Sequence, residues 1–196
     1  MRVSIIRHGM TRANEKRLYC GFTDLPLSEQ GKQNLTALRK FVIYPEENRA
    51  AYITSGLLRT TETLQILYDR KPDFIMEEFK ELNFGEFEMK SYDELKNIPE
   101  YQKWINGGNG AACPGGESRN DLEKRVKSGL DKLAYTQIDD AVIISHGGVI
   151  SVIMETLFPG IKNFYEWQPD FGRGYTLDIF NTQKTTKWPD ALISEI

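Results

Sequence analysis

Apolar positions along the chain form two kinds of pattern: short, nearly continuous runs, and longer stretches with a helical repeat. Residues 141–144 form the clearest run, which is typical of a strand covered on both faces, and residues 3–6 are interpreted as a short buried strand. Four other short segments have a similar but weaker character. The predicted strands cover residues 3–6, 51–54, 73–76, 141–144, 175–180 and 191–196.

Between these runs, apolar residues recur every three or four positions, as on one face of a helix. Ser28 is placed to cap a helix that runs to about Tyr44, and Ser118 with Asp121 resembles a capping box. The predicted helices cover residues 28–44, 57–68, 118–133 and 149–157. Strands that alternate with helices predict an α/β fold, a three-layer α/β/α sandwich with a mostly parallel central sheet.

Residues 77–116 follow neither pattern and are rich in aromatic residues and then in glycine. We interpret this segment as a lid-like insertion within a single domain that spans residues 1–196. Short helices are expected in it around Tyr92 and Tyr101. Ordinary packing within the insertion is the favoured role for most of its aromatic side chains, and a cap over a substrate is the alternative.

Composition and charge indicate the cellular compartment of the protein and the classes of partner that it does not favour. The 196 residues carry a net charge of -3, which does not favour nucleic acid or anionic membranes as partners. The two cysteines, Cys20 and Cys113, have neither disulfide nor metal spacing and are expected to be reduced thiols. The apolar run before Arg7 is too short for a signal peptide, and no run could span a membrane. We expect a cytoplasmic protein, and the sequence leaves its oligomeric state open.

The candidate chemistry lies where two predicted strands end. The only two histidines, His8 and His146, each follow an apolar strand and precede a glycine. Arg7 adjoins the first, and Arg59 starts the helix after the second strand. Carboxyl ends of parallel strands share one edge of a sheet, so these four side chains are expected to form one anion pocket. Taken singly, each histidine would be an ordinary hydrogen-bonded residue and each arginine a surface residue.

Six segments resemble, in the same order, the motifs of the histidine phosphatase superfamily, which has the phosphoglycerate-mutase-like fold. They lie within residues 1–150. The matching segments are Arg7–Thr11 with Asn14, residues 21–28 with Gly31, residues 55–63, residues 79–85, residues 114–118 and residues 145–148.

The resemblance implies that His8 is a nucleophile that carries a phosphohistidine. The two arginines neutralise the phosphoryl charge, and they also repel a proton from the attacking imidazole. His146 hydrogen-bonds the transferring group, and Gly9 leaves room for it beside the ring. The pocket is further lined by Asn14, by the Cys20–Gly21 backbone and by Gly147. No metal or other cofactor is implied.

A leaving alkoxide needs a proton, and the resemblance selects Glu81 as its donor. Phe79, Leu82 and Phe84 are expected to desolvate this carboxyl group. Residue composition alone does not select Glu81, because several glutamates lie close by. Glu88 is the second choice.

These features predict a metal-independent phosphatase that hydrolyses a small phosphorylated metabolite. The alternative is a cofactor-dependent phosphoglycerate mutase, and a minor one is a phosphate-ligand binding protein without turnover. Met10 stands where mutases typically have glutamate, which favours hydrolysis. Lys124, Arg125 and Lys127 are interpreted as a solvated helix face.

Overall fold

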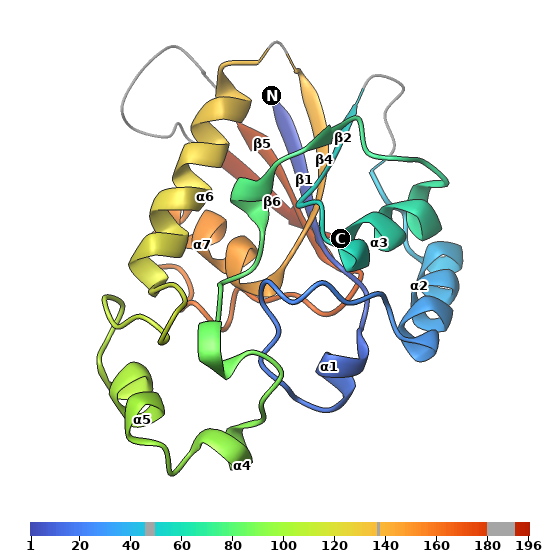
Figure 1. The fold of residues 1–196 in the computed structure, drawn as a ribbon. Coiled ribbons are helices and arrows are strands. Elements are labelled where there is room, and N and C mark those ends of the chain that lie inside the picture. The colour runs from blue at the N-terminus through green and yellow to red at the C-terminus, as the bar shows by residue number, and fades with distance from the viewer. Residues whose placement is uncertain (46–49, 137, 180–190) are drawn as a thin grey trace.

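The computed structural model describes residues 1–45, 50–136, 138–179 and 191–196. Its centre is a six-stranded sheet with the order β3-β2-β4-β1-β5-β6 (Figure 1). β1, β2, β3 and β4 run parallel, whereas β5 and β6 are antiparallel to their neighbours. The strands are β1 (Arg2–Arg7), β2 (Ala51–Thr54), β3 (Phe74–Ile75), β4 (Asp140–Ser145), β5 (Gly174–Ile179) and β6 (Ala191–Glu195).

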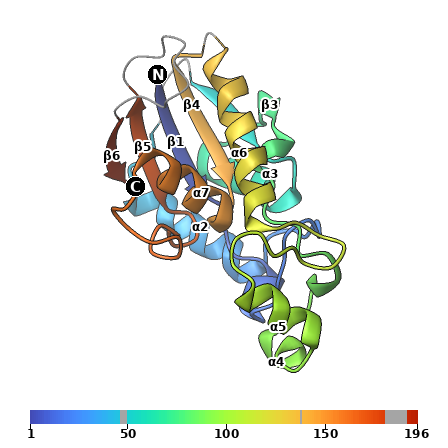
Figure 2. The same cartoon turned by 90° about the vertical axis from the view of Figure 1, so that its left-hand side faces the viewer.

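Helices cover both faces of this sheet, as the three-layer prediction requires (Figures 1 and 2). The α-helices are α1 (Arg12–Glu15), α2 (Glu29–Phe41), α3 (Leu58–Tyr68), α4 (Tyr92–Leu95), α5 (Pro99–Asn106), α6 (Arg119–Ala134) and α7 (Gly147–Leu157). Two short 3-10 helices, η1 (Glu77–Phe79) and η2 (Gly85–Phe87), lie between β3 and α4.

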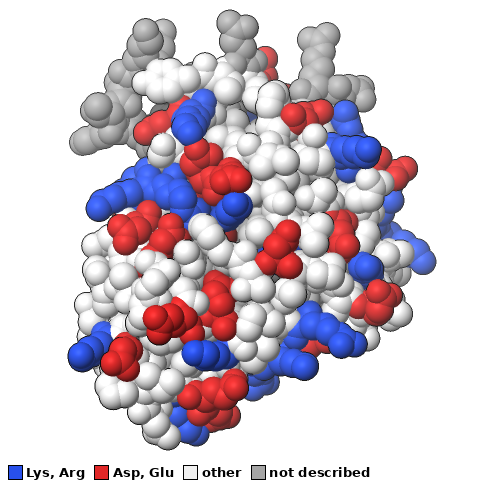
Figure 3. Space-filling view, viewed as in Figure 1, with Lys and Arg blue, Asp and Glu red and all other residues white. Residues whose placement is uncertain are grey.

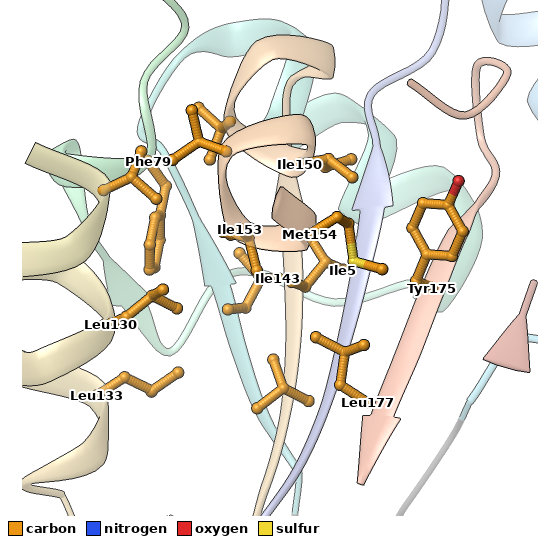
Figure 4. Close-up of a cluster of buried hydrophobic side chains, with 14 of the residues drawn as sticks. Ile5, Phe79, Leu130, Leu133, Ile143, Ile150, Ile153, Met154, Tyr175 and Leu177 are labelled. Atoms are coloured by element: carbon orange, nitrogen blue, oxygen red, sulfur yellow. The ribbon is translucent and has the colours of Figure 1, made fainter. Parts of the chain in front are cut away.

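The alternation of side chains along β1 and β4 divides the core in two. Ile5 and Ile143 pack in the larger cluster, beneath α6 and α7, as the close-up in Figure 4 shows. Ile6 and Ile144 point to the other face and pack with residues of α2 and α3. Because both faces are covered, β4 contains a continuous apolar run, which made it the clearest strand in the sequence, while the run in β1 is interrupted by Ser4.

The predicted elements are present, with shifts at some ends. The second helix ends at Phe41 rather than near Tyr44, since Tyr44 precedes a proline and such residues disfavour helical geometry. α7 begins at Gly147, two residues before the predicted start, because the surrounding fold outweighs the low helix propensity of the two glycines. Predicted residue 180 lies outside the described residues.

The segment between β3 and α6 projects beyond the carboxyl ends of the parallel strands (Figure 2). It contains a third apolar cluster formed by Phe87, Leu95, Tyr101 and Cys113, which is separate from the two clusters on the sheet. Short helices include both Tyr92 and Tyr101, as predicted. The segment therefore has a small core of its own, next to the sheet edge where ligands bind in such folds.

On the face shown in Figure 3, acidic and basic side chains are interspersed in small groups. This distribution matches the small net charge of the chain. Among the described helices, none is both long enough and apolar enough to cross a membrane.

Candidate active site

Two histidines meet at the carboxyl ends of β1 and β4. His8 directly follows β1 and His146 follows β4, and the two strands pair in parallel register up to Arg7 and Ser145. The ring centroids lie 5.0 Å apart, in an edge-to-face arrangement. Both side chains are buried. The strand register therefore brings together the two imidazoles that the sequence separates by more than a hundred residues.

The ring of His8 has one defined tautomer. Its Nδ1 lies 2.6 Å from the carbonyl oxygen of Gly9, which can only accept a hydrogen bond. Nδ1 therefore carries the proton, and a neutral ring keeps its lone pair on Nε2. Burial, and then the charges of Arg59 and Arg7, hold the pKa of His8 well below its ordinary value. A neutral ring with a free Nε2 is the form that can attack phosphorus.

Arg59 lies beneath this pair and is 1% exposed. Its guanidinium donates to the carbonyl oxygens of Gly21 at 2.6 Å and Thr23 at 3.0 Å. Its Nε donates to Nδ1 of His146 at 3.3 Å. The planar guanidinium of Arg59 thus holds both the loop around Gly21 and the His146 ring. Each of its Nη nitrogens has a second hydrogen that can be donated to a ligand.

Arg7 approaches from the other side. Its Nη1 donates to the carbonyl oxygen of Pro169 at 2.8 Å, and its guanidinium carbon lies 4.1 Å from the centre of the Phe171 ring. Its Nε is buried and has no hydrogen-bond partner among the described residues. Burial lowers the pKa of Arg7 from its ordinary value, and the charges of Glu81 and Asp170 only partly oppose this effect. The two guanidiniums and two imidazoles therefore form a buried cationic site, as the sequence predicts.

Two buried neutral histidines make stability depend on pH. Burial and then Arg59 lower the pKa of His146 as well as that of His8. The unfolded chain binds protons near pH 6.5 that the folded chain does not, so stability is lost as the pH falls. Below pH 6.5, the free energy of unfolding should decrease with falling pH, by up to about 2.7 kcal/mol per pH unit. Each histidine contributes about 1.4 kcal/mol of this slope. Urea unfolding between pH 7.5 and 5.5 measures this slope, and His8→Asn should halve it. Equal stability of the wild-type protein across that range would contradict the prediction.

Glu81 reaches the site from the segment after η1. One carboxylate oxygen accepts from the amide of Leu82 at 2.9 Å, and the other accepts from the amide of Gly148 at 3.0 Å. Gly148 lies in the first turn of α7, where helix amides lack internal partners. The sequence led us to expect that Phe79 shields Glu81 from water. In the structure the Phe79 ring is instead buried in the larger core cluster.

Glu88 has a different environment. Its two oxygens accept from the amides of Gly21, Phe22, Thr23 and Phe84 and from the Thr23 hydroxyl. Five donors on one carboxylate tie the loop around Gly21 to the loop before η2. This geometry assigns Glu88 to holding the two loops and leaves Glu81 as the carboxylate that faces open space.

A cavity of about 440 Å³ opens beside Glu81, between the segment that joins β3 to α6 and the start of α7. Its wall is mostly apolar and includes five aromatic residues, and its polar groups lie at a few positions. The aromatic lining residues are Tyr19, Phe84, Trp104, Phe164 and Tyr165, and the polar ones include Glu81, Asn109, Arg119 and Gln168. Arg119 pairs with Glu155 and lies over the ring of Phe164. Its lining includes Glu81 and Gly148 but neither histidine, so the cavity adjoins the cationic site rather than containing it.

Gly9 and Gly21, which are both predicted to line the pocket, have different roles in the structure. Gly9 does not leave space beside the ring: an added Cβ there would lie 2.5 Å from Leu35, and its amide donates to Thr63. The glycine instead allows the loop to pack closely on α2. Gly21 faces Arg59 with its carbonyl, while its amide is taken by Glu88.

Asn14 accepts twice from Thr11 through Oδ1 in the capping box of α1, which leaves its Nδ2 as the end available to a ligand. An added Cβ at Gly147 would lie 3.4 Å from the guanidinium carbon of Arg7. Cys20 is half-buried, and its Sγ contacts the carbonyl oxygen of Thr23 at 3.6 Å. Gly147 and Cys20 therefore lie close to Arg7 and Arg59, whereas the contacts of Asn14 are with Thr11.

Comparison with known proteins agrees with this geometry. A model of the histidine phosphatase superfamily (branch 1) matches residues 3–187. The chain belongs to the histidine phosphatase superfamily. The family match extends well past residue 150, where the resemblance of the sequence motifs ends.

Similar proteins in this superfamily carry two kinds of name. An adenosylcobalamin/alpha-ribazole phosphatase from Escherichia coli (strain K12) is 31% identical over 80% of this chain and 79% of its own. A protein named "Probable phosphoglycerate mutase GpmB" from Yersinia pestis (strain Pestoides F) is 30% identical over 80% and 74%. The crystal structure of the alpha-ribazole phosphatase from Shigella flexneri has a TM-score of 0.81 at 26% identity and covers 97% of this chain and 96% of that chain.

Several residues around the site of this histidine phosphatase were missed or misjudged from the sequence. Arg125 is not on a solvated face: it pairs with Glu117 and donates to the carbonyl oxygens of Glu78, Lys80 and Glu81. It thereby anchors the segment that carries Glu81. Ser55 contacts His146. A helix pattern does not distinguish an arginine that is anchored in this way from an exposed one.

Proposed function

We propose that this phosphatase of the histidine phosphatase superfamily cleaves small phosphate monoesters by transfer of the phosphoryl group to Nε2 of His8. The observation that supports this most directly is the hydrogen bond from Nδ1 of His8 to the Gly9 carbonyl, which leaves Nε2 free at the cationic site. Nε2 forms the bond to phosphorus while the bond from phosphorus to the ester oxygen breaks. Arg7, Arg59 and His146 bind the three phosphoryl oxygens as their charge redistributes.

Glu81 is proposed to handle the protons. In the first step its carboxyl group gives a proton to the departing alkoxide. In the second step the carboxylate takes a proton from water, whose oxygen attacks the phosphorus of the phosphohistidine. Inorganic phosphate leaves and the His8 ring returns to its neutral form. Its position beside the cavity supports this role, because the leaving group would lie there.

The proton donor can be tested through the leaving group. Glu81→Gln should lower the kcat for an alkyl phosphate about 100-fold, within the range for general acid catalysis. The same variant should cleave p-nitrophenyl phosphate with a much smaller loss in the first step, since p-nitrophenolate leaves without a proton. Pre-steady-state bursts separate that step from hydrolysis of the phosphoenzyme. Glu86→Gln, at an exposed glutamate on η2, is the control. Equal losses in burst rate for both substrates would remove Glu81 from the role of acid.

The cavity supports a substrate with a planar organic group, and the names of the relatives make alpha-ribazole phosphate the first compound to test. Its aromatic walls can stack on a heterocycle, and Arg119 and Asn109 can meet polar groups of a sugar. Arg119 is the one cation among the described lining residues and is already paired with Glu155. A second acidic group on the substrate, such as the carboxylate of a phosphoglycerate, would therefore meet no unpaired cation among the described lining residues.

A substitution in the lid tests this assignment. Trp104→Leu should raise the KM for alpha-ribazole phosphate about tenfold, in keeping with a lost stacking contact of ~1–3 kcal/mol. The KM for glycerol phosphate should change little, so the pair of substrates is its own control for damage to the lid. Parallel changes in both values would argue against stacking at Trp104.

The phosphoglycerate mutase alternative rests on the similarity to the protein with that name. Steady-state release of inorganic phosphate without a bisphosphorylated primer would favour the phosphatase. Isomerisation of a phosphoglycerate that needs such a primer would favour the mutase. We further propose a cytoplasmic location, which the two free cysteines support.

A further inference from the structure

His146 is connected through its Nε2 to a line of buried hydroxyl groups. Its Nε2 lies 2.8 Å from Oγ of Ser55, and that oxygen lies 3.2 Å from Oγ1 of Thr60. The Thr60 hydroxyl in turn lies 2.7 Å from the carbonyl oxygen of Leu57. Ser55, Thr60 and His146 are all fully buried. Water therefore does not share these hydrogen bonds, and the direction of each one matters.

The donors in this line can be assigned from its end. The Leu57 carbonyl can only accept, so the Thr60 hydroxyl donates its single hydrogen there and accepts from Ser55. Ser55 has then used its own hydrogen and accepts from His146. Nε2 of His146 must therefore carry a hydrogen.

The opposite side of the ring gives the same answer independently. Nε of Arg59 is a donor only, and it lies 3.3 Å from Nδ1 of His146. Nδ1 must therefore hold a lone pair in the free protein. Yet a nitrogen that accepts from Arg59 cannot at the same time donate to a phosphoryl oxygen. The ring must gain a hydrogen at Nδ1 before it can take part in binding an anion.

We propose that Ser55 and Thr60 are positioning residues that hold His146 as its Nε2–H tautomer, so that anion binding protonates Nδ1 and makes the ring a doubly donating imidazolium. The proton comes from solvent or from a monoanionic ligand and remains on the ring. Ser55 continues to accept from Nε2, and Arg59 turns its Nε hydrogen to the anion. This inference rests on the proposed function for the identity of the ligand but not on any chemical step.

The groups around the ring explain why the proton arrives with the anion. In the free protein, burial and then the charge of Arg59 disfavour the imidazolium, and the pKa of His146 is well below its ordinary value. A dianion placed among the same arginines reverses the sign of the local potential. The titratable or charged groups near the ring are Arg59 on α3, Arg7 and His8 at the end of β1, Arg125 on α6, and Glu81 bound to the first turn of α7.

The chain's two histidines make this directly measurable. In protein labelled with ¹⁵N at histidine, four ring nitrogens are observed, and His8→Asn identifies those of His146. Sulfate is the probe, because it is tetrahedral and does not titrate near neutral pH. At pH 7.5 without sulfate, Nδ1 of His146 should have the chemical shift of an unprotonated nitrogen. Saturation with sulfate should move it to that of a protonated one, while Nε2 stays protonated throughout.

Calorimetry gives a second readout. Titration of the His8→Asn protein with sulfate in two buffers of different ionisation enthalpy should show uptake of about one proton per bound anion, which is then assigned to His146. Ser55→Ala removes the acceptor of the Nε2 hydrogen and should weaken sulfate binding roughly tenfold, with reduced proton uptake. Ser151→Ala is the matched control, since Ser151 is a buried serine on α7 with no hydrogen-bond partner among the described residues.

The outcomes separate this inference from the proposed function. A protonated Nδ1 in the free protein, or an Nδ1 shift that does not move up to the highest sulfate concentration, would overturn it. Sulfate binding with no proton uptake, or unchanged affinity and uptake in Ser55→Ala, would overturn it as well. None of these measurements involves turnover, so failure to trap a phosphoenzyme on His8 would instead count against the proposed function alone.

Discussion

Replacement of His8 by alanine should lower kcat/KM by roughly 10⁵-fold, the scale of loss seen when a covalent nucleophile is removed. The remaining groups can still bind and neutralise a phosphoryl group, but none of them offers a lone pair in place of Nε2. Binding of sulfate should survive, because Arg7 and Arg59 remain. The expected result is therefore a protein that binds the anion but does not turn over.

Trapping the phosphoenzyme tests whether His8→Ala loses activity because the nucleophile is missing. Wild-type protein quenched during turnover of a labelled substrate should carry label that is stable in base and lost in acid, as expected for a phosphohistidine. His8→Ala should carry none. His146→Asn is a useful comparison, since it keeps the nucleophile and should still become labelled, although slowly. Label that persists in His8→Ala would assign the nucleophile to another residue.

The sequence was sufficient to predict the sheet edge at which the site lies. The runs at residues 3–6 and 141–144 are largely apolar because both faces of their strands are covered, and a histidine lies two residues after the end of each run. A parallel register then leaves few positions for His8 and His146 other than side by side. This inference depends on strand ends alone, so the small errors in helix ends did not affect it.

Polar contacts between distant segments could not be predicted in the same way. Nothing in the local pattern around Glu88 distinguishes a carboxylate with five donors from a general acid, because four of the five donors come from the loop around Gly21. Arg125 fits the exposed face of a helix by its position, yet it donates to three backbone carbonyls of another segment. Such roles depend on which loop lies opposite, and periodicity carries no information about that.

The prediction that Gly9 leaves room for the phosphoryl group was wrong for a related reason. A glycine beside a predicted nucleophile suggests space for a ligand, but here the space is filled by Leu35 of α2. The hydroxyls of Ser55, Thr60 and Thr63 were likewise not singled out, although they hold the rings or the loop of the site. Small residues in a motif indicate close contact, and only the packing shows with what.

Arg59→Lys should lower kcat/KM about a thousandfold, although the charge is kept. The guanidinium makes three contacts at once, to Gly21, Thr23 and His146, and still presents hydrogens to a ligand. An ammonium group has one centre and cannot span these partners. The loop carbonyls would lose donors, and Nδ1 of His146 would lose the group that holds its lone pair.

The matched control is Arg39→Lys on α2, where an exposed guanidinium also donates to a backbone carbonyl, that of Ile66. It should leave kcat/KM within about twofold, as surface substitutions usually do. Stopped-flow measurement of phosphoenzyme formation should place the loss in Arg59→Lys in the first chemical step. An Arg59→Lys variant as active as Arg39→Lys would mean that charge alone suffices, and the fork geometry would then not be what orients the phosphoryl group for attack by Nε2 of His8.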